Sequence, residues 1–185
     1  FIVPFGTIAT AAHTLVQQVT QLTHIVGGGV GQASGVMAGQ NLGAKQPERA
    51  EKSGWLGAGL YTIIMAVSSL IIWFWGENII SIFNNEPDIL EAGKAFLRIQ
   101  VVTYLVSGYA VVLQQCLNGV GDTLPVMVVV MLSVFGTQIP LAFYLSQHTG
   151  LGVYGTYWAI VSGTVFMAGS YALYFKLGRW KQKRI

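Results

Sequence analysis

Charged side chains are scarce in this chain, and four long stretches contain none at all. Asp, Glu, Lys and Arg together make up 9% of the 185 residues, and they are missing from 1–44, 53–76, 99–121 and 123–175. A helix that crosses the hydrocarbon core needs about 20 apolar residues, and a water-soluble domain rarely goes so long without charge. The scarcity predicts an all-α membrane protein and argues against a soluble nucleic-acid-binding domain, despite a net charge of +3.

The residue patterns of enzymes and metal sites are also missing. The single cysteine, Cys116, allows no disulfide framework, and three scattered histidines give no metal-ligand spacing. The sequence contains no H-E-x-x-H, no G-x-S-x-G and no Walker A lysine. All seven Asp and Glu lie at the ends of hydrophobic stretches, so none is placed at the bilayer centre to carry a proton or sodium ion. We therefore expect no enzyme activity, no catalytic residue, no metal site and no cofactor in this chain.

The hydrophobic stretches divide into five expected membrane segments. The longest uncharged stretch, 123–175, is too long for one crossing and breaks naturally at the polar residues 146–150. The first segment is unusual, since a continuous helix over 8–43 would be about 54 Å long against a hydrocarbon thickness of about 30 Å. It should bend, extend beyond the bilayer, or both. The expected segments are approximately 9–43, 54–76, 96–118, 124–145 and 153–175.

Basic residues are divided unequally between the two sides that these segments define. Eight of the ten Lys and Arg fall on one side, in the first connection and in the tail 176–185, whereas Lys94 and Arg98 fall on the other. Short loops rich in Lys and Arg stay in the cytoplasm, so we expect the tail inside the cell. The partners of these residues would then be anionic lipid headgroups of the cell membrane rather than nucleic acid.

Glycine and proline indicate where helices should bend or approach one another. Glycine weakens helical order, and a proline deep in a membrane helix should kink it, with Ser133 or Thr137 satisfying the freed carbonyl groups. The residues expected at bends are Gly27, Gly28, Gly29, Gly31 and Pro140. Small residues that recur at every fourth position also let a neighbouring helix approach closely. This glycine stripe consists of Gly27, Gly31, Gly35, Gly39 and Gly43.

Two polar faces interrupt the apolar segments. Polar groups that face lipid are costly, so these faces should look toward protein or water, either as packing contacts or as the lining of a cavity. The side chains of the first face are His13, Gln17, Thr20, Gln21 and His24. Those of the second are Gln100, Thr103, Tyr104, Ser107 and Gln114. A further group, expected to anchor helix ends at the membrane interface, comprises Trp73, Trp75, Trp158, Trp180, Tyr61 and Tyr174.

Four groups of residues, in order along the chain, resemble the C-terminal lobe of the multidrug and toxic compound extrusion (MATE) family. They are AGQNLGA and QPERA within 38–50, IFNNEP at 82–87, LNGVGDT at 117–123 and IPLA at 139–142. The resemblance covers nearly the whole chain. It implies a twelve-helix transporter with two six-helix lobes, of which this chain would hold about the last five helices. The chain begins abruptly with apolar residues and without Met, as expected of a piece whose upstream helices are missing.

The resemblance also implies a function, the export of lipophilic and often cationic organic compounds in exchange for protons or sodium ions. A central cavity would open alternately to each side of the membrane. The side chains expected in this cavity are His13, Gln17, Gln21, His24, Tyr104, Ser107 and Gln114. Some family members couple sodium through an acid midway along the helix that corresponds to 96–118. Here that stretch has Ser107, Gly108 and Tyr109, so we expect the coupling site in the N-terminal lobe, outside this chain.

Other interpretations stay open from the sequence. The chain could instead belong to a lipid or polysaccharide-precursor flippase of a related fold. A strongly basic central cavity would favour this interpretation. The expected spans contain no Lys or Arg apart from Arg98 at a segment end, so this interpretation ranks lower. A non-transporting scaffold or inactive fragment, held together by the glycine stripe, is a further alternative.

Overall fold

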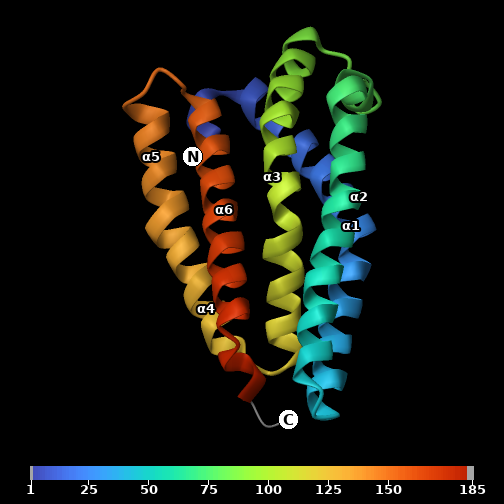
Figure 1. The fold of residues 1–185 in the computed structure, drawn as a ribbon. Coiled ribbons are helices and arrows are strands. Elements are labelled where there is room, and N and C mark those ends of the chain that lie inside the picture. Colours follow the sequence, from blue (N-terminus) through green and yellow to red (C-terminus); the bar gives the residue numbers. More distant parts are fainter. Residues whose placement is uncertain (1, 183–185) are drawn as a thin grey trace.

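Within residues 2–182, which the computed structural model describes, the chain folds into five long helical rods (Figure 1). Lys183 and Arg184 of the expected basic tail lie outside the described residues. The segments α4, η2 and α5 follow one another directly and form a single rod, Thr123–Gln147. The elements are η1 (Val3–Phe5), α1 (Thr7–Gly43), α2 (Pro47–Ser81), α3 (Pro87–Gly119), α4 (Thr123–Met131), η2 (Leu132–Gln138), α5 (Ile139–Gln147), α6 (Val153–Leu177) and η3 (Arg179–Gln182).

The helix boundaries follow local signals in the sequence. Pro47 and Pro87 occupy the first turns of α2 and α3, where the N–H that proline lacks would have no intrahelical partner. Just before α3, the side-chain oxygen of Asn84 accepts a hydrogen bond from the N–H of Glu86 at 2.7 Å. The helix α6 ends at Leu177 and is followed by Gly178, whose φ of 71° lies in the left-handed region that favours glycine.

Four of the rods, α2, α3, Thr123–Gln147 and α6, are long and apolar enough to cross a bilayer. The remaining rod, α1, does not meet this standard although it has 37 residues. Its glycines and its polar side chains, among them His13, Gln17 and Gln21, dilute the apolar residues that a membrane span ordinarily needs. The expected first segment is therefore a long helix, but its composition differs from that of the other four.

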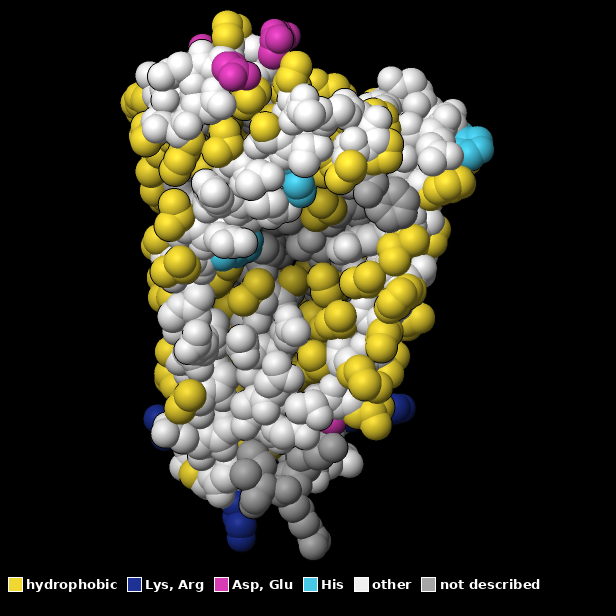
Figure 2. Space-filling view, turned by 180° about the vertical axis from the view of Figure 1, so that it is seen from behind, with side chains coloured by type: hydrophobic (Ala, Val, Ile, Leu, Met, Phe, Trp, Pro, Cys, Tyr) yellow, Lys and Arg dark blue, Asp and Glu magenta, His cyan; other side chains and the backbone are white. Residues whose placement is uncertain are grey.

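Charged side chains collect at the two ends of the molecule and leave an uncharged belt between them. In Figure 2 most of the visible acidic side chains lie at one end, Lys and Arg lie toward the other, and many hydrophobic side chains lie on the belt between them. The acidic end holds the α2–α3 connection, where Glu77 and Lys94 form an ion pair. The basic end holds the α1–α2 connection and η3. This distribution suits a protein whose middle lies in hydrocarbon, where an unpaired charge is costly.

The helix α3 lies at the centre of the packing, in contact with α1, α2 and α6. A methyl group on Gly35 would lie 2.6 Å from the carbonyl oxygen of Gln115, and one on Gly39 would lie 2.5 Å from the carbonyl oxygen of Gly119. The backbones of α1 and α3 therefore touch at these positions. The close approach predicted from the glycine stripe is confirmed here, because only a residue without a side chain fits.

The glycine stripe does not face a single neighbour along its whole length. Gly27 faces the ring of Tyr61 on α2, whereas Gly31 lies beside Val111 on α3. Gly43, at the end of α1, has open space around it. A repeat of four residues drifts around a helix with 3.6 residues per turn, so the stripe passes from one neighbour to the next.

The bends predicted at glycine and proline have different outcomes. The helix α1 continues without interruption through 27–31, and Gly28 and Gly29 have open space around them. A change in the direction of its axis there stays a prediction. In the fourth rod, the π-helix Leu132–Gln138 directly precedes the turn that contains Pro140. The local distortion thus lies on the N-terminal side of the proline, where the missing N–H leaves a carbonyl group without its usual partner.

The expectation that Ser133 satisfies a freed carbonyl group of its own helix is wrong. Its hydroxyl donates instead to the carbonyl oxygen of Gly163 on α6, at 2.9 Å. Ser133 is fully buried, because it lies on the face of the rod that packs against α6. The side chain of Gln138 also packs against Gly163, where a methyl group would not fit. The neighbouring helix therefore holds the π-helix in place.

Replacing Gly35 tests the contact between α1 and α3. Gly35→Leu should lower the Tm of the purified intact protein, because overpacking of a close contact costs about 1–3 kcal/mol. The matched control is Ala33→Leu, since Ala33 is exposed two positions away on the same helix. Thermal unfolding followed by tryptophan fluorescence compares the two variants. Equal Tm values would show that the backbones of α1 and α3 do not meet at Gly35.

Candidate functional site

A row of hydrogen bonds joins the polar face of α1 to three tyrosines, each from a different helix. The pairs are His13 Nδ1 with Tyr157 Oη on α6 at 2.8 Å, Thr20 Oγ1 with Tyr104 Oη on α3 at 3.0 Å, and His24 Nδ1 with Tyr61 Oη on α2 at 2.7 Å. All three tyrosines are buried. A buried tyrosine hydroxyl needs a partner, and so does a polar group in hydrocarbon, so each pair satisfies both members. We call these six residues the histidine–tyrosine layer.

Ring contacts hold the histidine–tyrosine layer in position. The ring of Tyr157 stacks on Phe96 of α3 with 4.5 Å between centroids. His24 meets the ring of Tyr104 edge-on, with centroids 5.7 Å apart. Edge-to-face and offset-stacked rings are the favoured arrangements of aromatic pairs, and here they restrict the directions in which the hydroxyls of Tyr157 and Tyr104 point. The layer is therefore a packed polar seam between four helices.

Four of the predicted cavity residues belong to the histidine–tyrosine layer or lie directly beside it. His13, His24 and Tyr104 are members of the layer. Ser107, one turn along α3, is buried, and its hydroxyl donates to the carbonyl oxygen of Tyr104 at 2.8 Å. Each of these side chains makes at least one hydrogen bond within the lobe, as the packing interpretation of the two polar faces expects, but both histidines are only half-buried.

The other predicted cavity residues lie nearer the surface. Gln21 is exposed on α1, and Gln17 is half-buried one turn before it. Gln114 on α3 is also half-buried. The polar face of α1 is thus divided between residues bonded inside the lobe and glutamines available to another molecule. That any of them contacts a substrate stays a prediction.

Two members of the layer, Tyr61 and Tyr157, were on neither of the polar faces identified from the sequence, and Thr20 was on the first face but not among the predicted cavity residues. The prediction that Tyr61 anchors a helix end at the membrane interface is wrong, because its side chain is 0% exposed and bonds to His24. A signal for both was available. Each tyrosine lies within an expected membrane segment, where a buried hydroxyl must find a polar partner on another helix.

The other predicted interface anchors also divide into two groups. Trp73, Trp75 and Trp158 are exposed, as that role requires. Trp180 is 0% exposed, so the prediction is wrong for this residue. Tyr174 is half-buried and donates to the carboxylate of Asp122 at 2.7 Å, which ties α6 to the start of α4.

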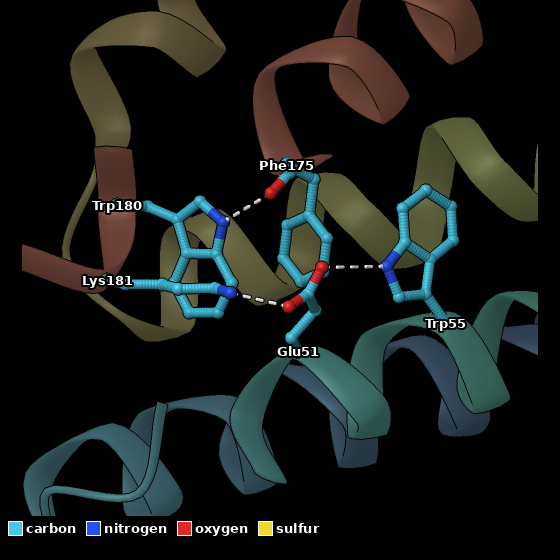
Figure 3. Close-up of polar contacts among 5 residues, drawn as sticks. All are labelled: Glu51, Trp55, Phe175, Trp180 and Lys181. Carbon is cyan, nitrogen blue, oxygen red and sulfur yellow. Dashed lines mark hydrogen bonds and ion pairs between the residues drawn. The ribbon is translucent and has the colours of Figure 1, made fainter. Parts of the chain in front are cut away.

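The residues that close the basic end of the lobe form a second polar cluster (Figure 3). The ammonium group of Lys181 forms an ion pair with Glu51 of α2, whose other oxygen accepts from Trp55 Nε1 at 3.3 Å. Trp180 stacks on Phe175 with centroids 4.6 Å apart and donates to its carbonyl oxygen at 2.9 Å. These five residues, the tail lock, fold the first part of the basic tail back onto the start of α2.

At Gly108, midway along α3, there is little room for the side chain of an ion-coupling acid. A methyl group on Gly108 would lie 3.1 Å from the carbonyl oxygen of Ala58 and even closer to the hydroxyl of Thr62. The backbones of α2 and α3 approach closely here, so a carboxylate side chain at this position would separate them. Among the described residues, no group of three or more His, Cys, Asp and Glu is placed to hold a metal ion.

Arg98 also lies away from the histidine–tyrosine layer. It is exposed near the acidic end of α3, and its guanidinium group lies 5.4 Å from the ring centroid of Trp73 on α2. A cation over the face of an indole at an exposed site contributes about 0.5–1 kcal/mol. This contact accounts for Arg98 without placing it in a central cavity.

Comparison with known proteins agrees with this arrangement of helices. The model of the MatE family matches residues 1–144. The chain belongs to the MatE family. A similar curated protein is the "Probable multidrug resistance protein YoeA" of Bacillus subtilis, 28% identical over 188 residues, which covers 100% of this chain and 40% of the relative. The "Probable multidrug resistance protein NorM" of Burkholderia pseudomallei is 29% identical over 168 residues, which covers 88% of this chain and 36% of the relative.

Solved structures of MATE proteins share the fold of this MatE-family chain. The structure described as "MATE in the bent conformation" gives a TM-score of 0.86 at 18% identity, over 93% of this chain and 38% of that one. An outward-facing "multidrug resistance MATE family transporter of the MOP superfamily" gives 0.85 at 17% identity, over 92% and 38%. The predicted all-α membrane fold, that of one lobe of a larger transporter, is confirmed. The chain spans about two fifths of the length of these relatives.

Removing one hydroxyl tests the histidine–tyrosine layer. Tyr61→Phe keeps the ring but leaves His24 without its partner, so the intact protein should lose about 1–3 kcal/mol of unfolding free energy. Tyr144→Phe is the matched control, because Tyr144 is 58% exposed. Chemical unfolding in detergent measures both variants. The assignment is contradicted if the control loses as much stability as Tyr61→Phe.

A double-mutant cycle tests the tail lock. Combining Glu51→Gln with Lys181→Gln should reveal a coupling of about 1 kcal/mol, near the top of the range for partly exposed ion pairs. The pair Glu77 and Lys94 serves as the control, since its side chains are 55% and 41% exposed compared with 27% and 28% for Glu51 and Lys181. A coupling no larger than that of the control pair would mean that Lys181 does not hold the tail in solution.

Proposed function

We propose that this chain is most of the C-terminal lobe of a secondary antiporter that exports drug-like or toxic organic compounds in exchange for protons or sodium ions. The observation that carries the proposal is the match of the chain to one lobe of MATE transporters over 91–94% of its length. The names of its curated relatives, multidrug resistance proteins, support the class of substrate. The partner of the lobe would be an N-terminal lobe of similar size, with the cavity between them.

The likeness of the lobe to transporters in different conformations supports alternating access. The chain gives a TM-score of 0.85 against an outward-facing structure and 0.83 against an inward-facing one. A lobe that fits both states almost equally well can move largely as a rigid body. The histidine–tyrosine layer supports such motion, because it cross-links α1 to α2, α3 and α6. The changes in access would then occur between lobes rather than within this one.

The orientation of the lobe follows from its charged ends. Lys45, Arg49, Lys52 and the start of the tail lie at the basic end. Short loops rich in Lys and Arg face the cytoplasm, so we place this end and the C-terminus inside the cell. The acidic α2–α3 connection would then face outside.

The polar face of α1 is the part of the lobe best suited to meet the substrate. Its half-buried histidines each bond to a tyrosine of the lobe, while Gln17 and Gln21 keep amide groups that can reach another molecule. A lipophilic cation favours acceptor oxygens together with aromatic faces, and the buried rings of Tyr104 and Tyr157 lie behind this part of α1. The coupling ion would bind in the N-terminal lobe, because α3 offers no carboxylate between 99 and 121.

Drug susceptibility of cells that express the intact protein tests the proposal. The protein should raise resistance to lipophilic cations, and collapse of either the proton or the sodium gradient should remove this resistance. Gln21→Ala should reduce it, whereas Gln18→Ala should not, because Gln18 is also exposed but lies off the polar face. Resistance that persists after both gradients collapse would rule out an antiporter.

A further inference from the structure

An open groove runs between α1 and α2 at the basic end of the lobe. Its volume is about 580 Å³, within the range of roughly 300–1,000 Å³ found for small-molecule sites. Each helix contributes side chains three or four positions apart, so one face of each helix forms one wall. Ala33 and Met37 line the α1 wall, and Leu56 and Leu60 line the α2 wall.

The mouth of this α1–α2 groove is basic and lacks an acidic partner. Lys52 and Arg49 line the groove about one and two helical turns before Leu56. Arg49 donates one hydrogen bond to Gln46 at 3.0 Å, which leaves other guanidinium N–H groups free. Lys52 is exposed and makes no hydrogen bond or ion pair with the residues that the structure describes. Two adjacent cations without a counter-ion at the end of an apolar groove call for an anionic group.

Beyond the groove, the apolar wall of α2 continues along the exposed side of the helix. Leu56 and Leu60 are 64% and 51% exposed, and Ile63, Val67 and Leu70 continue the same face at steps of three and four residues. An exposed apolar stripe of this length on a membrane helix is suited to contact with lipid chains. The groove is therefore amphipathic along its length, with charge at one end and hydrocarbon-compatible walls at the other.

We infer that this groove binds one anionic phospholipid from the leaflet at the basic end. The phosphate of the headgroup lies between Arg49 and Lys52, and an acyl chain lies against Met37, Leu56 and Leu60. The distance along α2 from Arg49 to Leu60 is about 16 Å at 1.5 Å per residue, which suits the upper part of an acyl chain. Basic pockets between membrane helices on the cytoplasmic side bind anionic headgroups in this way. The inference does not depend on which compound the protein transports.

Lipid binding to the purified intact protein in detergent tests the site, with dioleoylphosphatidylglycerol as the probe and native mass spectrometry as the readout. The double variant Arg49→Gln with Lys52→Gln should bind the first lipid about thirtyfold more weakly, since each cation contributes about fivefold. Lys45→Gln with Lys176→Gln removes the same charge at the same end but lies outside the groove, and it should retain most of the affinity. Equal losses in the two double variants would overturn the site.

Further probes separate the headgroup from the acyl chain. Dioleoylphosphatidylcholine should bind much more weakly than phosphatidylglycerol, and inorganic phosphate at the same concentration should not compete. Ala33→Phe fills the groove from an exposed position and should weaken phosphatidylglycerol binding without lowering the Tm. Competition by inorganic phosphate would show that the site recognises only an anion and not a lipid. Unchanged binding by Ala33→Phe would show that the acyl chain does not lie in the groove.

The remaining alternative is that another part of the intact protein covers the groove. A fluorescent label on Leu60→Cys distinguishes a bound lipid from a covering protein segment. The label attaches selectively at this position, because Leu60 is exposed whereas the native Cys116 is buried. Phosphatidylglycerol with brominated acyl chains should quench this label more strongly than brominated phosphatidylcholine does. An unquenched label would mean that protein rather than lipid occupies the groove, and would overturn the inference.

Discussion

An unpaired polar group in hydrocarbon costs several kcal/mol, and this penalty determines how α1 packs. The helix carries more polar side chains than a lipid-exposed span can tolerate, so its polar face must find partners within the protein. Hydroxyl groups from α2, α3 and α6 provide them at His24, Thr20 and His13. Toward the C-terminal end of α1, glycine allows the backbone of α3 to approach. The lobe is therefore assembled around α1 by paired polar groups at one end and by close backbone contact at the other.

Much of this architecture could be predicted from the sequence, because its signals are repeated along whole segments. The uncharged stretches predicted five long helices, and the spacing of Gly35 and Gly39 predicted a close helix contact. The four short groups of residues that resemble the MATE family predicted the lobe. Each of these signals reflects a physical requirement that acts along the chain itself, either hydrophobic length or residue size at a fixed period.

The candidate site was harder to predict, because its pairs join residues far apart in the sequence. The polar face of α1 was recognisable, but nothing local shows that His24 meets Tyr61 or that His13 meets Tyr157. Tyr61 was interpreted as an interface anchor because composition alone does not reveal depth in the membrane. Ser133 or Thr137 was expected to satisfy a freed carbonyl group of its own helix, yet the hydroxyl of Ser133 donates to Gly163 on the neighbouring α6. Partner choice in such cases is decided by three-dimensional packing.

The tail lock has a consequence for the biosynthesis of the protein. Glu51 and Trp55 leave the ribosome more than a hundred residues before Trp180 and Lys181, so the start of α2 must wait for its partners. Until then the aromatic face of Phe175 lacks the ring that stacks on it. A chain that ends before Gly178 would enter the bilayer without the Trp180 and Lys181 contacts of the tail lock. The last residues of α6 and the start of α2 therefore complete their packing only when the residues after Gly178 have been made.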